Sequence, residues 1–160
     1  MGTGKSGRYS GTKGSLPSPG SIDYMSPDDS FSKYISNRKD IDVNGFHDVI
    51  AHGTPNSIMI EHNGQQLEVN HRTLSKLLSR NKESKDKAIR LLSCNTGKVT
   101  AGFAQNLANK LNRPVKAPTD YLWANSNGSY FVAGGKIVNN RLVPDLTKKG
   151  TFKTYKPRRK

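Results

Sequence analysis

The side chains best suited to chemistry are the only cysteine, Cys94, and a histidine 42 residues before it, His52. Each follows a short apolar run, over residues 46–51 and 88–93, that is typical of a buried strand. If the two strands are neighbours in a parallel sheet, their carboxyl ends meet at one edge, and so do the thiol and the imidazole. A thiol beside an imidazole ionises more readily and becomes a nucleophile. The pair therefore predicts nucleophilic catalysis, with Cys94 as nucleophile and His52 as general base.

The residues next to this pair complete the expected site. The amide N–H groups of Gly53 and Cys94 are the expected oxyanion hole, since glycine lets a substrate carbonyl approach the backbone closely. A sharp turn over residues 95–97 leads into a helix, whose N-terminal dipole would favour the thiolate. No His-x-x-x-His or Cys-x-x-Cys spacing occurs, so we expect neither a metal nor a cofactor. We assign substrate binding to three residues: Asn95, Thr96 and Trp123.

The strands and helices that must position these groups alternate along the chain. Three short strands and two helices follow one another from residue 46 to 118, which is typical of parallel strands with right-handed crossovers. A further helix is expected to start at Ser26 as N-cap with Pro27 in its first position. The prediction is an α/β fold: a small, mainly parallel central sheet flanked by helices. Added β-hairpins are expected to turn at 63–64, 127–128 and 139–140.

Composition divides the 160 residues into one domain and two ends. Residues 1–20 are rich in glycine and serine and predict a flexible linker, residues 21–146 a single catalytic domain, and residues 147–160 a basic tail. The net charge is +14, and ten of these surplus charges lie in the two ends. Such a charge favours polyanions, so nucleic acid is a possible partner. No apolar run is long enough for a membrane span, and the start of the chain has no signal-peptide core.

Two segments resemble the strand-end motifs of the caspase-like (clan CD) cysteine peptidases. These are Val49-Ile50-Ala51-His52-Gly53 and Leu91-Leu92-Ser93-Cys94-Asn95-Thr96-Gly97, and residues 102–111 are similar to the helix that follows the cysteine in that group. The resemblance is strongest to CHAT proteins and to the self-processing peptidase domains of bacterial toxins. It implies a caspase-like core in which His52 is the base, Cys94 the nucleophile, and the Gly53 and Cys94 amides the oxyanion donors.

The whole chain resembles the C-terminal toxin module of bacterial polymorphic toxins of the Rhs or contact-dependent type. The resemblance lies in a small basic domain after a Gly/Ser linker, in the run 114–120 before an Asn-Gly hairpin, and in the glycine-aromatic segment 150–157. It implies an effector that a bacterium secretes or delivers as part of a larger protein and that acts in the target-cell cytoplasm. Proteolysis or deamidation of a target-cell protein would be its activity, and a cognate, acidic immunity protein its partner.

Two other classes of function remain open on the sequence. A cationic nuclease toxin would use the charge, with histidines as general bases or metal ligands and aromatic rings of Tyr121, Trp123 and Tyr130 to stack bases. Apart from His52, however, the histidines are expected to be solvated surface residues: His47, His62 and His71. The third class is a non-catalytic binding module, in which His52 and Cys94 are core residues.

Overall fold

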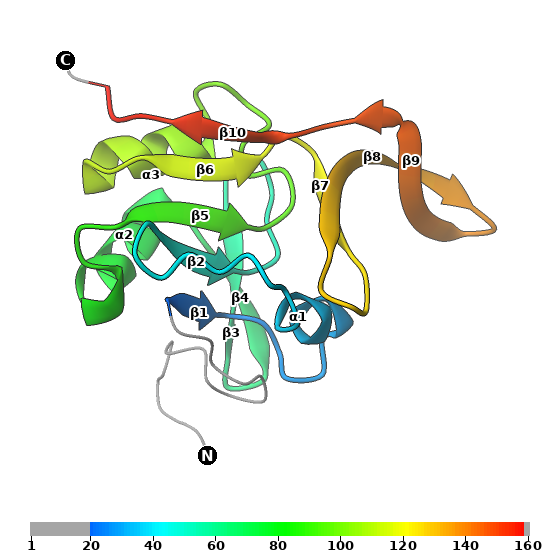
Figure 1. Ribbon diagram of the computed structural model, residues 1–160, viewed down its shortest axis with the longest axis horizontal. Helices are drawn as coiled ribbons and strands as arrows, with labels where there is room; N and C mark the ends of the chain where they lie inside the picture. Colours follow the sequence, from blue (N-terminus) through cyan, green and yellow to red (C-terminus); the bar gives the residue numbers. More distant parts are fainter. Residues whose placement is uncertain (1–19, 159–160) are drawn as a thin grey trace.

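The computed structural model describes residues 20–158, so nearly all of the predicted linker lies outside the described residues. A five-stranded sheet forms the centre, with the strand order β1-β2-β5-β6-β10 (Figure 1). The first four strands of this order run parallel to one another, and β10 pairs antiparallel with β6. The strands of this sheet are β1 (Ser21–Asp23), β2 (Phe46–Ile50), β5 (Ala88–Leu92), β6 (Val115–Pro118) and β10 (Phe152–Tyr155).

The hairpins form two sheets of their own, with turns where the sequence predicts them. The two-stranded sheet joins β3 (Ile58–His62) to β4 (Gln65–Val69), and Asn63 and Gly64 turn with φ of +52° and +80°. Positive φ at both turn positions is what a two-residue hairpin loop requires, and asparagine and glycine tolerate it best. Asn139 and Asn140 turn the same way, with φ of +52° and +63°. The three-stranded sheet contains β7 (Tyr121–Ala124), β8 (Tyr130–Val138) and β9 (Arg141–Lys149).

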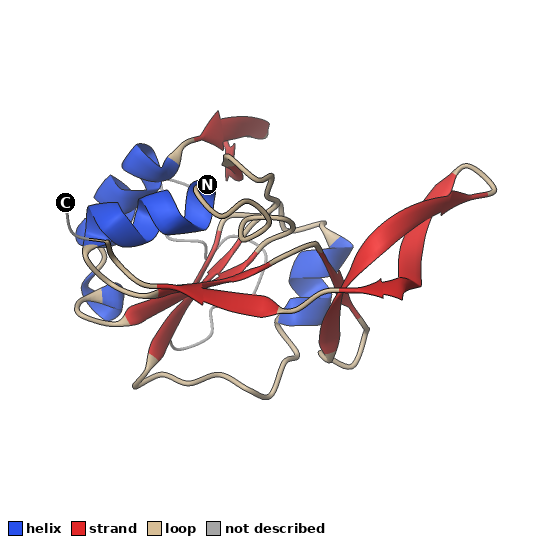
Figure 2. Cartoon of the chain, turned by 90° about the horizontal axis from the view of Figure 1, so that it is seen from above, coloured by secondary structure: helices blue, strands red, loops and turns tan. Residues whose placement is uncertain are grey.

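The predicted fold class is wrong. Strands make up 39% of the structure and helices only 19%, so this is a strand-rich protein with mixed and antiparallel sheets rather than a helix-flanked, mainly parallel caspase-like fold. The distal part of β8 and β9 extends from the body as a two-stranded arm (Figures 1 and 2). The local patterns locate most strands correctly, but periodicity along one strand does not identify its partner. The sequence pattern therefore did not reveal that the hairpins form separate sheets or that β10 pairs antiparallel with β6.

Residues 147–158, which composition assigned to a basic tail, are part of this structure. They contain the end of β9 and all of β10, whose Lys153 and Thr154 pair with Ala117 and Lys116 of β6. Their lysine and arginine side chains are exposed, while Tyr155 is buried and donates a 2.7 Å hydrogen bond to the Gly97 carbonyl. The pairing of β10 with β6 and the burial of Tyr155 therefore make this segment part of the folded domain rather than a tail.

Four helical segments accompany the sheets: α1 (Ser30–Ile35), α2 (His71–Ser79), the single 3-10 turn η1 (Lys82–Ser84) and α3 (Phe103–Leu111). Helix α1 begins later than predicted, because Asp29 and not Ser26 is its N-cap. One carboxylate oxygen of Asp29 accepts from the amides of Phe31 and Ser32, at 2.8 and 3.4 Å. None of the helices between residues 20 and 158 is both long and apolar enough to cross a membrane.

The two faces of the central sheet differ in chemistry. On one face, Val49 of β2 and Leu91 of β5 pack in a single cluster with Leu74 of α2 and Phe103 and Leu107 of α3. All five side chains are at most 1% exposed, and burying each one stabilises the fold by roughly 1.5–3 kcal/mol. Because side chains alternate along a strand, the residues next to Val49 in β2 and next to Leu91 in β5 point to the opposite face of the sheet.

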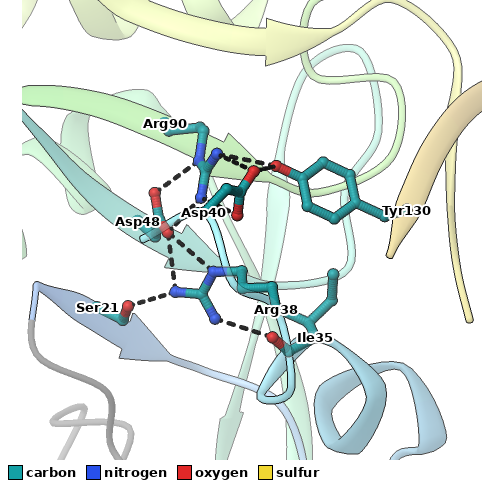
Figure 3. A network of polar contacts seen from close by, with 7 residues as sticks. All are labelled: Ser21, Ile35, Arg38, Asp40, Asp48, Arg90 and Tyr130. Atoms are coloured by element: carbon teal, nitrogen blue, oxygen red, sulfur yellow. Dashed lines mark hydrogen bonds and ion pairs between the residues drawn. The ribbon is translucent and has the colours of Figure 1, made fainter. Parts of the chain in front are cut away.

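That opposite face holds a buried network of charged groups (Figure 3). Asp48 of β2 accepts from two guanidinium groups, from Arg38 Nε at 3.0 Å and Nη2 at 2.8 Å, and from Arg90 Nη2 at 2.7 Å and Nε at 2.8 Å. Arg90 of β5 also donates to Asp40 and to the Tyr130 hydroxyl, and Tyr130 donates to Asp40. The network therefore ties the segment after α1 and the start of β8 to the central sheet.

Candidate functional site

The carboxyl ends of β2 and β5 lie side by side, as the sequence predicts. Ile50 pairs with Leu92, the last pair of the two strands, and His52 and Cys94 each lie two residues beyond it. The two chain segments stay close together beyond this pair, since a Cβ built on Gly53 would lie 2.7 Å from the Cys94 carbonyl oxygen. A larger residue at position 53 would therefore push the two strand ends apart.

A cavity of about 420 Å³ opens between these strand ends, α1 and β7. His52, Gly53 and Cys94 line it together. The His52 side chain is 46% exposed, whereas Cys94 packs against the second core cluster, which is built on Ile50 and Leu92. The remaining walls come from side chains or backbone of Met25, Ser30, Phe31, Tyr34, Ala51, Tyr121, Leu122, Trp123, Ala124 and Leu142.

A third polar residue, which the sequence analysis missed, joins this pair. The Oδ2 atom of Asp29 lies 2.6 Å from Nε2 of His52. The other oxygen of the same carboxylate caps α1, so the helix fixes the carboxylate that holds the imidazole. A histidine that donates its Nε2–H to a carboxylate keeps Nδ1 as the basic nitrogen of its neutral ring. A capping aspartate before an apolar turn is a visible signal in the sequence, but nothing there indicates that it faces His52.

Cys94 sits in a different environment from the one the sequence predicted. Its Sγ accepts from the amide of Leu122 at 3.3 Å and lies 3.8 Å from the Leu122 carbonyl oxygen. Burial raises the pKa of the Cys94 thiol above its ordinary value, so the resting group is a neutral thiol. In the described part of the chain, no hydrogen bond joins Cys94 to His52.

Helix α3 does not aim its N-terminus at the thiol, contrary to the expectation from the turn at residues 95–97. The helix begins only at Phe103, after the non-helical segment that follows the turn. The amide of Phe103 donates to the Pro55 carbonyl at 2.9 Å, and the amide of Ala104 donates to the Thr96 carbonyl at 3.1 Å. The helix dipole therefore acts on this loop rather than on Cys94.

The two amides predicted to form the oxyanion hole make no backbone hydrogen bond in the described part of the chain. Among residues 20–158, no backbone carbonyl accepts from the N–H of Gly53 or of Cys94. The neighbouring amides are occupied, since Asn95 N–H donates to the Asp120 carbonyl at 2.9 Å and Gly97 N–H to the Pro118 carbonyl at 2.8 Å. The Gly53 and Cys94 amides thus make no backbone hydrogen bond to any described residue, and the Cys94 amide interacts with its own sulfur, while the turn around them is fixed.

The three residues predicted to bind substrate lie in two different places. Trp123 lines the cavity, and its indole N–H donates to the Ala133 carbonyl at 3.0 Å. Asn95 and Thr96 are not among the cavity walls. Thr96 is fully buried and its hydroxyl donates to the Ser93 carbonyl at 3.1 Å, while Asn95 turns the chain with a φ of +64°. The Thr96 hydroxyl and the Asn95 backbone stabilise the turn that follows Cys94.

The remaining histidines lie apart from the cavity. His47 is fully buried in β2, so the prediction that it is a surface residue is wrong. Its two ring nitrogens have no hydrogen-bond partner in the described chain, and burial lowers its pKa to about 4. His62 ends β3 and His71 begins α2, and both are partly exposed. Within residues 20–158, no three His, Cys, Asp or Glu side chains are grouped as metal ligands would be.

Comparison with known proteins gives one family. Residues 20–132 match the model of a domain of unknown function, DUF8616. The chain belongs to this family. The DUF8616 match contains Asp29, His52 and Cys94 and ends within β8, so β9 and β10 lie beyond it. No curated protein and no solved structure matches the chain.

Proposed function

We propose that this DUF8616 domain is a cysteine-dependent acyl-transfer enzyme in which Asp29, His52 and Cys94 act as a triad. The observation that carries the proposal is the 2.6 Å contact between the Asp29 carboxylate and the His52 ring. The same His52 ring lines the cavity that is also lined by Cys94, the only cysteine of the chain. A carboxylate that holds a histidine by one nitrogen fixes its tautomer and orientation, so that the other nitrogen can accept a proton from the nucleophile.

The reaction begins with a neutral thiol, because burial raises the pKa of Cys94. As its sulfur attacks the substrate carbonyl, the S–H proton passes to His52, towards which the Cys94 side chain rotates while Asp29 holds the imidazole in place. The carbonyl oxygen becomes an oxyanion, and the amides of Gly53 and Cys94, from which no described backbone carbonyl accepts, supply donors to it. Collapse forms a thioester and expels the amine, which takes the proton from His52. Water then hydrolyses the thioester and regenerates the thiol.

The leaving amine distinguishes the two activities that this chemistry allows. A peptide amine would make the enzyme a peptidase, and ammonia from a side-chain amide would make it a deamidase. The resemblance to polymorphic-toxin modules supports a target-cell protein as substrate and delivery from a bacterium. The exposed lysines and arginines of β8, β9 and β10 support an acidic partner, such as a cognate immunity protein.

The experiment uses p-nitrophenyl acetate as an acyl donor and follows p-nitrophenol release and acetylation of Cys94 by mass spectrometry. Cys94→Ala is expected to abolish acylation. Asp29→Asn keeps the oxygen that caps α1 but replaces the one facing His52, so we expect turnover to fall by about 10²- to 10⁴-fold. Asp28→Asn is the matched control, since Asp28 is the preceding residue and is exposed. Equal turnover in the two aspartate variants would refute the triad.

A second arm tests the competing classes of function in a susceptible cell. Expression of the wild-type domain is compared with Cys94→Ala, Cys94→Ser and His52→Ala. Growth inhibition that persists undiminished in Cys94→Ala would exclude the thiol as its cause. RNA or DNA degradation that survives the same substitution would favour the cationic nuclease.

A further inference from the structure

We infer that the cavity of this domain selects a polypeptide substrate with a bulky apolar side chain beside the reacting carbonyl, and that Leu142 of the arm determines this preference. The inference rests on the proposed function, because it names the substrate class of the same site. The observations that carry it are the composition of the cavity walls and their continuity with the arm.

The cavity walls contain no lysine, arginine, aspartate or glutamate. This is notable in a chain with 26 basic residues, and the walls are instead built from rings and apolar chains around His52 and Cys94. A charged substrate side chain would lose its hydration there and find no counter-ion among the wall residues. A volume of about 420 Å³ lies within the usual range of ligand pockets and leaves room for an aromatic side chain. The site therefore favours apolar over charged substrates.

Leu142 extends these walls onto the arm. A Cβ built on Gly135 would lie 2.8 Å from Leu142 Cδ1 and 3.2 Å from Tyr121 Cε2, so the missing side chain of Gly135 lets these two residues converge. Leu142 pairs with Ile137 across the hairpin, which places both on one face of the arm. They are 47% and 66% exposed.

An apolar strip thus runs from Tyr121 in the cavity through Leu142 to Ile137. Side chains left this exposed gain burial when a ligand covers them. A small amide would fill only the cavity, whereas an extended polypeptide would fill the cavity and also cover the strip. This continuity is the reason to name a polypeptide as the occupant.

The test measures how fast Cys94 is labelled by chloromethyl ketones of acetylated amino acids, followed by intact-mass spectrometry. Each rate is divided by the rate with iodoacetamide, which carries no side chain. We expect the phenylalanyl probe to react about 10-fold faster than the alanyl probe, and the aspartyl and lysyl probes to react more slowly than the alanyl one. Equal normalised rates for the phenylalanyl and alanyl probes would overturn the inference.

Two substitutions on the same strand locate the preference. Leu142→Asp adds a charge to the cavity wall and is expected to lower the normalised phenylalanyl rate about 10-fold. Leu146→Asp is the matched control, because Leu146 is 61% exposed on β9 and does not line the cavity. Equal losses in the two variants would refute the role of Leu142.

The outcomes separate this inference from the proposed function. Labelling of Cys94 without side-chain preference refutes the inference alone, and the triad is still supported if Asp29→Asn impairs acetate turnover. Undiminished acetate turnover in Cys94→Ala refutes the proposed function, whichever probe labels the wild-type protein faster.

Discussion

Replacing Asp48 by asparagine removes the one carboxylate that lies between two buried guanidinium groups. The side chains of Asp48 and Arg38 are 2% and 1% exposed, and that of Arg90 is 10% exposed. After the substitution a neutral amide faces both cations. Arg90 keeps its pair with Asp40, whereas Arg38 has no other carboxylate partner in the described chain. The change is nearly isosteric, so its effect reports the charge rather than a cavity.

The magnitude follows from this burial. Removing one partner of a buried ion pair costs about 3–5 kcal/mol, because the remaining charge stays buried without compensation. At about 2–4 °C per kcal/mol for a domain of this size, the melting temperature should fall by roughly 6–20 °C. Asp40→Asn is the matched control: it removes a carboxylate from the same network, but this side chain is 52% exposed. An exposed pair contributes about 1 kcal/mol or less, so the control should lose a few degrees at most.

The assay is urea unfolding of both variants and the wild type at pH 7, followed by circular dichroism, with melting curves as a second measure. Equal slopes against urea concentration would show that the variants expose the same surface on unfolding. A loss below about 1 kcal/mol for Asp48→Asn, or one no larger than for Asp40→Asn, would refute the electrostatic account of this network.

Three further predictions concern the strand ends and the buried histidine. Because His47 has a pKa of about 4 in the folded protein, below its usual value of about 6.5, the unfolded chain takes up the proton first. The resulting stability is complete above about pH 6.5 and is lost as the pH falls towards 4, by up to about 3 kcal/mol. We expect a smaller acid-side loss in His47→Leu, measured by urea unfolding, and an equally steep loss would contradict this. Gly53→Ala places a methyl group 2.7 Å from the Cys94 carbonyl oxygen, so we expect about 1–3 kcal/mol lower stability and loss of acetate turnover. Wild-type values in both assays would contradict the close approach. Alkylation of Cys94 by iodoacetamide should rise at higher pH than that of a free cysteine, since burial raises the thiol pKa, and a midpoint at or below the free value would argue against this environment.

The sequence could predict the features of the fold that depend on residues close together in the chain. Apolar runs located β2 and β5, and the asparagine and glycine pairs located two hairpin turns, because strand periodicity and positive φ are local properties. That His52 and Cys94 line one cavity is consistent with one further assumption, that the two strands are parallel neighbours.

What the sequence could not predict depends on contacts between distant segments. Asp29 is 23 residues from His52, and only the folded α1 brings its carboxylate to the ring. Because histidine is a polar residue, the sequence suggested that His47 lies at the surface. The elements packed over β2 bury it instead. Likewise, β10 is recognised as a strand only once β6 offers an edge to pair with.

The cavity has walls from segments that begin at Met25 and extend to Leu142, which is most of the described chain. No contiguous fragment shorter than this span contains the whole site. Under the proposed function, partial folding therefore produces no partly active state, because Asp29, His52, Cys94 and Leu142 come together only when α1, β2, β5, β7 and β9 are all in place. A measurement of acyl transfer would then serve as a probe of complete folding, more demanding than any signal from secondary structure, and a destabilised variant would lose activity in step with its folded population.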